Sequence, residues 1–188
     1  MLKSAVELDK NYFELFDLAP TFSISLESLA ATFKVLQSQV HPDRFANAPD
    51  AEKRLSVQHS SYINQAYQTL RNPLQRAKYL LQLHGAKHRD ENHVQSHTIR
   101  DPQFLMQQME LRESLEHVAS EPDPLTALLR MDDDISNQIN VLYKELESCF
   151  KPGEVSPDAL SGAEEIVNRL QFLLKLQSEI SDKQQQLF

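Results

Sequence analysis

The chain is poor in the residues that build disulfide frameworks, metal clusters and tight turns. It contains one cysteine, Cys149, which excludes an intrachain disulfide and any multi-cysteine zinc or iron–sulfur site. Three glycines and no tryptophan leave little turn chemistry for a many-stranded sheet. No apolar run approaches the length of a membrane span, and residues 1–7 lack the apolar core of a signal peptide. We therefore expect an all-α, soluble protein of a reducing compartment, the cytoplasm.

Charge is distributed unevenly along the chain. Residues 1–90 hold 11 Lys and Arg against 9 Asp and Glu, whereas residues 91–188 hold 8 against 18. This asymmetry suggests two modules that face different partners. The alternative is that the acidic residues only keep the helices of the second half soluble. The second half is unsuited to nucleic acid, so we expect no nucleic-acid partner and no membrane partner.

A polar turn, His41-Pro42-Asp43, separates two helical patterns. Apolar residues recur at helical spacing over 26–40, and a second helical run begins at about Asp50. Pro42 disfavours the α conformation at His41, so the first helix should end at or just before that residue. The sequence thus predicts a helical hairpin that presents His41 and Asp43 at its tip.

Capping signals place two further helices beside this hairpin. Asn11 is a candidate N-cap for a short helix, and Ser25 and Asp50 are candidates for the two long ones. A fourth helix should begin at Pro73, where the missing N–H of proline costs nothing. We expect these four helices to form one compact module within residues 1–85.

The remainder of the chain predicts a second, three-helix module. Residues 86–100 are polar and lack periodicity, which indicates a linker. Three helix starts follow, each with a capping side chain before a proline: Asp101-Pro102, Asp123-Pro124 and Ser156-Pro157. Core positions of the last two helices recur at a spacing near 3.5: Leu128, Ile135, Ile139, Leu142, Leu146 and Cys149, then Leu160, Ala163, Val167, Leu170 and Leu174. This spacing predicts an antiparallel bundle over residues 101–188.

The helix that begins at Pro102 is apolar on two sides. At 100° per residue, its core stripe comprises Phe104, Leu111, Leu115 and Val118. A second group lies on another side of the helix: Leu105, Met106 and Met109, with Glu110 and Glu113 nearby. On the last helix, Phe172 lies opposite the predicted core positions. An exposed apolar patch beside acids is typical of a protein-binding surface, unless a broad buried face or the first module covers these side chains.

Two other functional classes are weaker. His84, His88, His93 and His97 are spaced four, five and four residues apart, and such imidazoles could form a zinc or nickel site. Gly85, however, should break the helix between the first two. No glycine-rich phosphate loop, serine nucleophile elbow or His-Glu-x-x-His motif occurs, so we expect neither an enzyme nor a cofactor.

Three segments, in this order, resemble the J-domain co-chaperones of the HscB type, which act in iron–sulfur cluster assembly. They are residues 41–43, Tyr62–Pro73, which looks like the third J-domain helix and its turn, and Phe104–Glu113, which is similar to the family's C-terminal domain. The resemblance covers nearly the whole chain from about Asn11. It implies a four-helix J-domain in residues 1–85 with a long antiparallel helical hairpin, followed by a three-helix bundle.

The resemblance also implies partners. The J-domain would stimulate the ATPase of a specialised DnaK-type chaperone (HscA-like) through His41, Pro42, Asp43, Lys34 and Arg44. The bundle would bind the iron–sulfur scaffold protein (IscU-like) through Leu105, Met106, Met109, Glu110, Glu113 and Phe172. Position 117 is acidic in relatives and is His117 here, with Glu116 beside it. An open alternative is a J-protein that delivers a different client to its chaperone.

Overall fold

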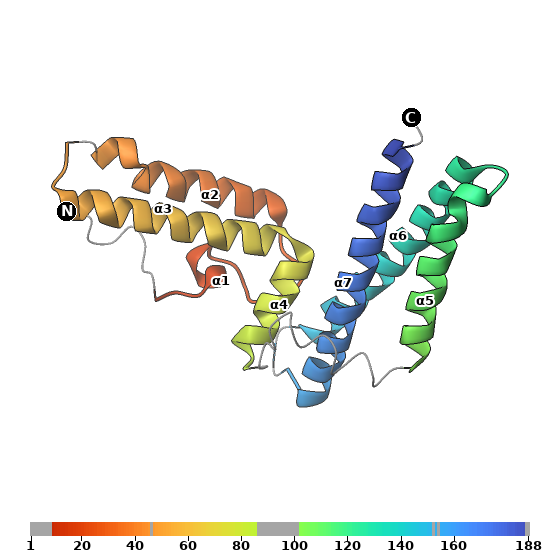
Figure 1. The fold of residues 1–188 in the computed structure, drawn as a ribbon. Coiled ribbons are helices and arrows are strands. Elements are labelled where there is room, and N and C mark those ends of the chain that lie inside the picture. Colours follow the sequence, from red (N-terminus) through yellow and green to blue (C-terminus); the bar gives the residue numbers. More distant parts are fainter. Residues whose placement is uncertain (1–8, 46, 86–101, 152, 154, 187–188) are drawn as a thin grey trace. The chain divides into compact units, whose positions relative to one another are not determined.

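The computed structural model describes residues 9–45, 47–85, 102–151, 153 and 155–186. Within these ranges the regular structure is helical and contains no strand, which confirms the all-α prediction (Figure 1). The chain divides into two compact units, one of residues 1–80 with 150–154 and one of residues 81–149 with 155–188. The predicted linker, 86–100, lies outside the described residues, so the proposed boundaries at 85 and 101 stay a prediction.

The first unit begins with a short helix, α1 (Tyr12–Leu15), which its cap holds in place. Asn11 Oδ1 accepts hydrogen bonds from the backbone N–H groups of Phe13 at 2.9 Å and Glu14 at 3.1 Å. The Asn11 N–H in turn donates to Glu14 Oε2 at 3.0 Å. This capping box confirms the predicted role of Asn11, because it satisfies donors that a helix start otherwise leaves unpaired.

Two long helices, α2 (Leu26–Val40) and α3 (Asp50–Arg71), run side by side as the predicted hairpin (Figure 1). Ser25 caps α2 as predicted, since its Oγ accepts a backbone N–H of the first turn at 3.1 Å. The rings of Phe33 and Tyr67 stack across the hairpin with centroids 4.1 Å apart. Aromatic stacking of this kind holds the two helices in register.

The predicted capping role of Asp50 is wrong. Pro49 is the N-cap residue of α3, without a side-chain hydrogen bond, and Asp50 is the first residue of the helix. The ring of Pro49 fixes its φ at −55° while ψ is extended at 150°, so the chain can enter the helix directly after it. Asp50 instead adds a negative charge to the first turn, where the helix dipole favours it, and lies 3.8 Å from Lys53 Nζ.

A cluster of three tyrosines fixes α1 against α3 and α4 (Pro73–Leu83). The Tyr12 and Tyr79 rings stack with centroids 4.3 Å apart, and Tyr12 meets Tyr62 edge-on at 5.5 Å. The Tyr12 N–H donates to the Tyr79 hydroxyl at 3.0 Å, and the Tyr62 hydroxyl donates to the Lys10 carbonyl at 2.6 Å. Burial raises the pKa of all three phenols above the usual value.

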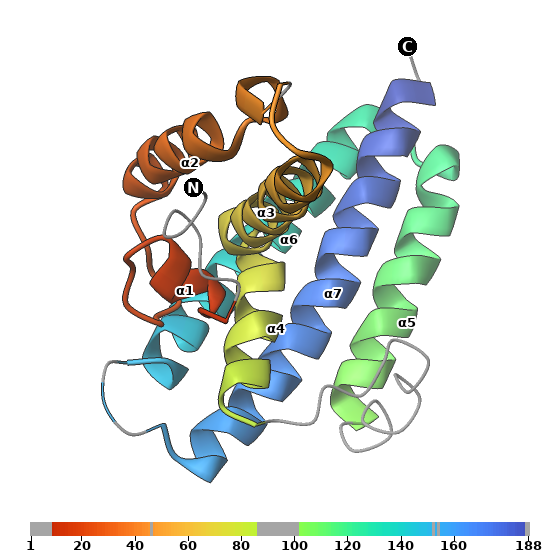
Figure 2. The same cartoon turned by 90° about the vertical axis from the view of Figure 1, so that its left-hand side faces the viewer.

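The second unit is an antiparallel bundle of three helices (Figure 2). They are α5 (Pro102–His117), which a short 3-10 turn follows, α6 (Pro124–Cys149) and α7 (Pro157–Gln186). The predicted caps of α6 and α7 are confirmed, because Asp123 Oδ1 accepts a first-turn N–H at 3.1 Å and Ser156 Oγ accepts one at 3.2 Å. Asp101, the predicted cap of α5, lies outside the described residues.

Helix α7 buries more of its surface than the predicted stripe. Ala163, Val167 and Leu170 are buried as predicted. Leu160 and Leu174, predicted to be buried, are only half-buried. Four other residues of the helix are buried as well: Ile166, Leu173, Leu176 and Ile180. The reason is that α7 packs against both α5 and α6, so its core positions spread over a broad face instead of one narrow seam.

We expect the tyrosine cluster to make the first unit sensitive to alkaline pH. Burial raises the pKa of Tyr62 in the folded protein, whereas a phenol in an unfolded chain ionises near about pH 10. Above that pH the unfolded state binds fewer protons than the folded state, so the free energy of unfolding falls as pH rises toward the folded-state pKa. The measurement is the urea midpoint of unfolding, followed by circular dichroism from about pH 8 to 11.

The variant Tyr62→Phe isolates the contribution of the Tyr62 phenol to this pH dependence of stability. Its midpoint should be lower than that of the wild type below pH 10, because the hydrogen bond to the Lys10 carbonyl, worth about 1 kcal/mol, is lost. The decline of its midpoint above pH 10 should be shallower, because the partly buried Tyr62 phenol no longer titrates. If the urea midpoints of the two proteins fell equally steeply with pH, the proposed contribution of the Tyr62 phenol would be contradicted.

Candidate functional site

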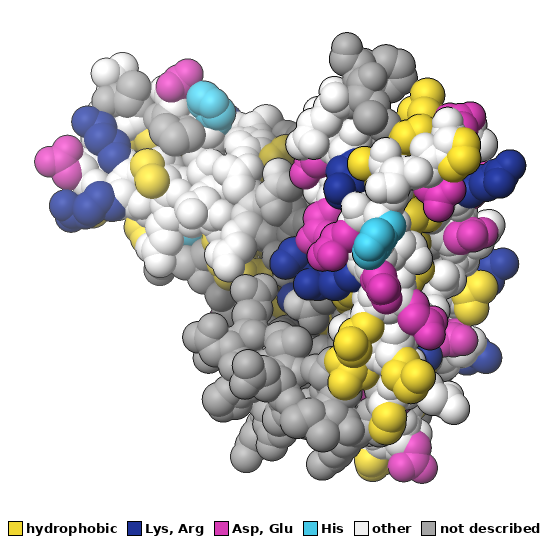
Figure 3. All heavy atoms as spheres, turned by 45° about the vertical axis from the view of Figure 1, so that its right-hand side comes forward, with side chains coloured by type: hydrophobic (Ala, Val, Ile, Leu, Met, Phe, Trp, Pro, Cys, Tyr) yellow, Lys and Arg dark blue, Asp and Glu magenta, His cyan; other side chains and the backbone are white. Residues whose placement is uncertain are grey.

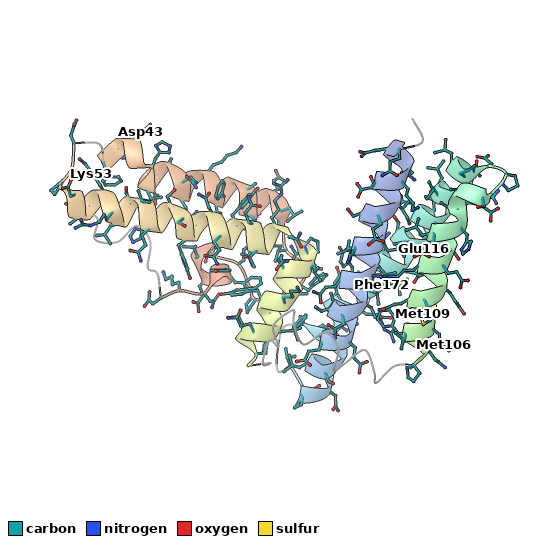
Figure 4. All side chains as sticks on the ribbon, in the orientation of Figure 1. Asp43, Lys53, Met106, Met109, Glu116 and Phe172 are labelled. Carbon is teal, nitrogen blue, oxygen red and sulfur yellow. The ribbon has the colours of Figure 1, made fainter. Side chains whose placement is uncertain are left out.

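Helix α2 ends directly before His41, and the chain then turns at the tip of the hairpin. His41 has an extended conformation, with φ −56° and ψ 128°, which the following proline favours. Residues Pro42–Phe45 form a 3-10 turn, η1, and the Arg44 N–H donates to the His41 carbonyl at 3.0 Å. This segment therefore lies outside both long helices, as predicted, and Figure 4 labels Asp43 at the end of the hairpin.

The side chains of His41 and Asp43 form a small polar unit at this tip. The Asp43 backbone N–H donates to His41 Nδ1 at 3.3 Å, and Nδ1 lies 3.6 Å from Asp43 Oδ2. When Nδ1 accepts this bond, a neutral ring carries its proton on Nε2. The two side chains are 53% and 91% exposed, so both can contact a partner. The turn orients the imidazole and leaves the carboxylate in water.

Arg44 replaces a hydrogen bond that Pro42 removes from the end of α2. Pro42 has no N–H, so the Ser38 carbonyl lacks its usual helical donor four residues later. Arg44 Nη1 donates to this carbonyl at 2.9 Å. A cation at a helix C-terminus is also favoured by the helix dipole. Of the other predicted residues, Lys34 is exposed on α2, about two turns before the tip.

Two cations that the sequence analysis did not single out lie at the start of α3. Lys53 and Arg54 are both exposed, and Figure 4 shows Lys53 at the same end of the hairpin as Asp43. The predicted hairpin could have identified both residues, because the start of the second helix of a hairpin must lie near the end of the first helix. These side chains add positive charge beside the tip.

The α5 surface, which we define as Leu105, Met106, Met109, Glu110, Glu113 and Glu116, faces solvent within its unit. Leu105, Met106 and Met109 are 42%, 62% and 65% exposed. The three acids are exposed as well. On the face in Figure 3, hydrophobic side chains gather at one end of the bundle, and acidic side chains follow them. The prediction that Leu105, Met106 and Met109 point away from the bundle core is confirmed.

Phe172 lies between α5 and α7 and is half-buried. Its position opposite the predicted stripe of α7 had indicated a more exposed side chain. Its ring meets Phe104 edge-on with centroids 5.9 Å apart. The Arg112 guanidinium lies 5.8 Å above the Phe172 ring, and Arg169 lies 5.5 Å above Phe104. Figure 4 shows Phe172 on α7, beside the methionines of α5. The aromatic pair therefore packs between α5 and α7, and both residues remain partly exposed.

Neither a metal site nor a reactive thiol is found among the described residues. His84 is exposed, and the other three histidines of the alternative metal site, His88, His93 and His97, lie outside those residues. No group of three or more potential ligands occurs in the part that the structure describes. Cys149, predicted to be buried, is half-buried, and burial and then the charge of Glu145 raise the pKa of its thiol. A raised pKa disfavours the reactive thiolate.

Residues 100–181 match the family described as the HSCB C-terminal oligomerisation domain. A co-chaperone protein HscB homolog from Shewanella halifaxensis is 43% identical over 178 residues, covering 95% of this chain and 99% of the relative. One from Pseudoalteromonas atlantica is 42% identical, covering 94% and 98%. Among solved structures, chaperone HscB from Vibrio cholerae has a TM-score of 0.81 at 36% identity, covering 95% of this chain and 100% of that one. Human co-chaperone HscB has a TM-score of 0.82 at 28% identity, covering 96% of this chain and 85% of that one.

No helix in the described ranges is long and apolar enough to cross a membrane.

Stability measurements should separate the outer residues of the α5 surface from the ring that supports them. Met109→Ala should change the free energy of unfolding by less than about 0.5 kcal/mol, because its side chain is mostly in water. Phe172→Ala should cost about 1–3 kcal/mol, because it removes the packing with Phe104 and the cation above the ring. Urea unfolding of each variant is the test, and a Met109→Ala cost as large as that of Phe172→Ala would contradict the exposure of Met109.

Proposed function

Because this chain belongs to the HscB family of co-chaperones, we propose that it couples two proteins of iron–sulfur cluster assembly. Its J-domain, residues 1–85, stimulates ATP hydrolysis by a specialised DnaK-type chaperone of the HscA kind. Its bundle, residues 101–188, binds an IscU-like scaffold protein and delivers it to that chaperone. Residues 86–100 link the two modules, and the protein works in the cytoplasm without a covalent step of its own. The exposure of three large apolar side chains on α5 is the observation that carries the delivery role.

The tip of the hairpin is the proposed contact with the chaperone. The exposed Asp43 carboxylate offers an acceptor for a charge-assisted hydrogen bond from an arginine of the ATPase. His41, which the Asp43 N–H holds, orients the turn and adds polar contacts. Lys34 and Arg44, together with Lys53 at the tip of the hairpin, favour an acidic docking surface. Stimulation follows only if this contact is stronger in the hydrolysis-competent state of the chaperone than in its resting state.

The α5 surface is the proposed contact with the scaffold. Leu105, Met106 and Met109 supply the apolar centre, and methionine side chains adapt to the shape of a partner. The acids at one side of this centre favour a scaffold that presents apolar residues next to basic ones. Phe172 contributes the part of its side chain that remains exposed, and its contact with Phe104 holds the neighbouring helix in place.

A second candidate function keeps the J-domain and changes the cargo. The same α5 surface could carry a different client to a DnaK-type chaperone, since an apolar centre beside acids specifies a kind of partner and not one protein. Binding of purified IscU-like scaffold to this chain, measured against an unrelated client, distinguishes the two functions. The scaffold should bind, and the unrelated client should not.

The first functional prediction concerns His41→Gln. This variant should lose stimulation of the HscA-like ATPase, because glutamine cannot reproduce the planar ring that the Asp43 N–H holds at the tip. Its helix content should equal that of the wild type, since His41 lies outside the helices. The assay is steady-state ATP hydrolysis with circular dichroism as the folding control. His84→Gln, the same change at another exposed histidine, should stimulate normally. Retained stimulation by His41→Gln would refute the assigned role.

The second functional prediction concerns the double variant Leu105→Ala, Met109→Ala. Scaffold binding should weaken by about 1–3 kcal/mol in binding free energy, because the apolar centre of the surface is removed. The matched control is Leu129→Ala on α6, where the leucine is 51% exposed but lies on another helix. Isothermal titration with the scaffold is the measurement. An unchanged affinity in the double variant, or an equal loss in Leu129→Ala, would rule out the α5 surface as the scaffold site.

A further inference from the structure

The buried stripe of α3 changes from apolar to polar toward the tip of the hairpin. Ile63, Ala66 and Leu70 are fully buried. The two buried residues nearer the tip are Ser56, which is 1% exposed, and His59, which is 7% exposed. At 100° per residue, His59 lies within about 40° of the three apolar residues around the helix axis, so its side chain belongs to the same buried face.

The register of the hairpin places His59 opposite the turn at the tip. The stacked aromatic pair across the hairpin and a hydrogen bond from Gln37 to Asn64 fix this antiparallel register. Five residues back along α3, from Asn64 to His59, it reaches residues 41–42 on the other side. Helix α3 and η1 are in contact, and Val40, the last residue of α2, is fully buried. His59 therefore lies where α3 meets the end of α2 and the turn.

The two buried polar side chains differ in their hydrogen bonds. The Ser56 hydroxyl donates to the Lys53 carbonyl at 2.9 Å, so it is satisfied within its own helix. His59 Nδ1 is enclosed and has no hydrogen-bond partner among the residues that the structure describes. An enclosed polar atom without a partner costs free energy, because folding removes the hydrogen bond that water supplies in the unfolded chain. An apolar side chain of similar size, such as leucine, would avoid this cost.

The end of the hairpin therefore holds its turn less firmly than an apolar stripe would. The turn itself is a unit, because Arg44 and the Asp43 N–H hold it by hydrogen bonds to Ser38 and His41. The cost at His59 falls on the contact between this unit and α3, and it lowers the free energy needed to separate them. Segments that adjust when a partner binds belong to such weakly held parts of a fold.

We propose that His59 is a positioning residue for the chaperone-binding tip, which weakens the contact of the His41–Asp43 turn with α3 so that the turn adjusts as a unit when it docks. The proposal rests on the proposed stimulation of a DnaK-type ATPase. It assigns a role to a residue that does not touch the chaperone, because His59 is enclosed in the hairpin. It also implies that a more stable hairpin tip is a weaker stimulator.

Two measurements on the full chain test the proposal with the variant His59→Leu. The urea midpoint of unfolding should rise, because the unpaired nitrogen is removed. The concentration of the chain that gives half-maximal stimulation of the HscA-like ATPase should rise about three- to tenfold, because a firmly held turn adjusts at a greater cost in free energy. His59→Met, whose flexible side chain adapts to the available space, should show both changes and is the second variant if leucine fits poorly.

Amide hydrogen exchange locates the effect, and two further variants control for it. In His59→Leu, exchange should slow at the tip, in residues 38–45 and 54–60, and stay unchanged in residues 66–71 at the other end of α3. Ser56→Ala is the matched control, because it removes a buried polar group that already has a partner. Ser56→Ala and His59→Gln, which keeps a polar group in place of the imidazole, should both stimulate at the wild-type concentration.

The outcomes separate the role of His59 from the proposed function. If His59→Leu and His59→Met are more stable but stimulate at the wild-type concentration, the positioning role is overturned and the proposed function stands. A lower urea midpoint in both variants would also overturn the role, because the imidazole would then stabilise the hairpin. If the wild-type chain does not stimulate the ATPase, the proposed function fails and the role of His59 fails with it.

Discussion

Helix α5 can bury only one of its faces, and its contacts with α6 and α7 decide which face that is. The buried Leu115 and Val118 and the edge-on pair of Phe104 and Phe172 occupy that side. Because side chains follow each other at 100° around a helix, Leu105, Met106 and Met109 must then face water. A protein that keeps three large apolar side chains in solvent gives up hydrophobic burial, and a partner that covers them recovers it. The scaffold-binding site that we propose combines this apolar centre with the acidic end of the same face, which favours a basic partner surface.

A comparable constraint shapes the tip of the hairpin. Pro42 ends α2 by taking away the N–H that the Ser38 carbonyl would otherwise accept, and Arg44 supplies a substitute from inside the turn. His41 is held from the other side by the Asp43 N–H. The Asp43 carboxylate is thereby presented to solvent from a short, hydrogen-bonded segment instead of a long open loop. A contact built in this way loses little conformational entropy when a partner binds.

Local signals made much of this structure predictable. The caps at Asn11, Ser25 and Ser156 depend on residues three positions away or fewer, so the sequence contains the whole interaction. The prediction failed at Asp50, because Pro49 already takes the N-cap position and Asp50 is therefore the first residue of the helix. It also fell short at Leu173 and Leu176, which are buried although they lie outside the predicted stripe, on a helix that contacts both α5 and α6. Such tertiary coverage is not encoded in the periodicity of a single helix.

Both contact surfaces can be located in one experiment, a backbone amide chemical-shift titration of the full chain, first with the IscU-like scaffold and then with the HscA-like chaperone. We expect the scaffold to shift the amides of residues 105–117 and of Phe172, and the chaperone to shift those of residues 38–54. A scaffold-induced change centred on the hairpin tip, with the α5 amides unaffected, would contradict it.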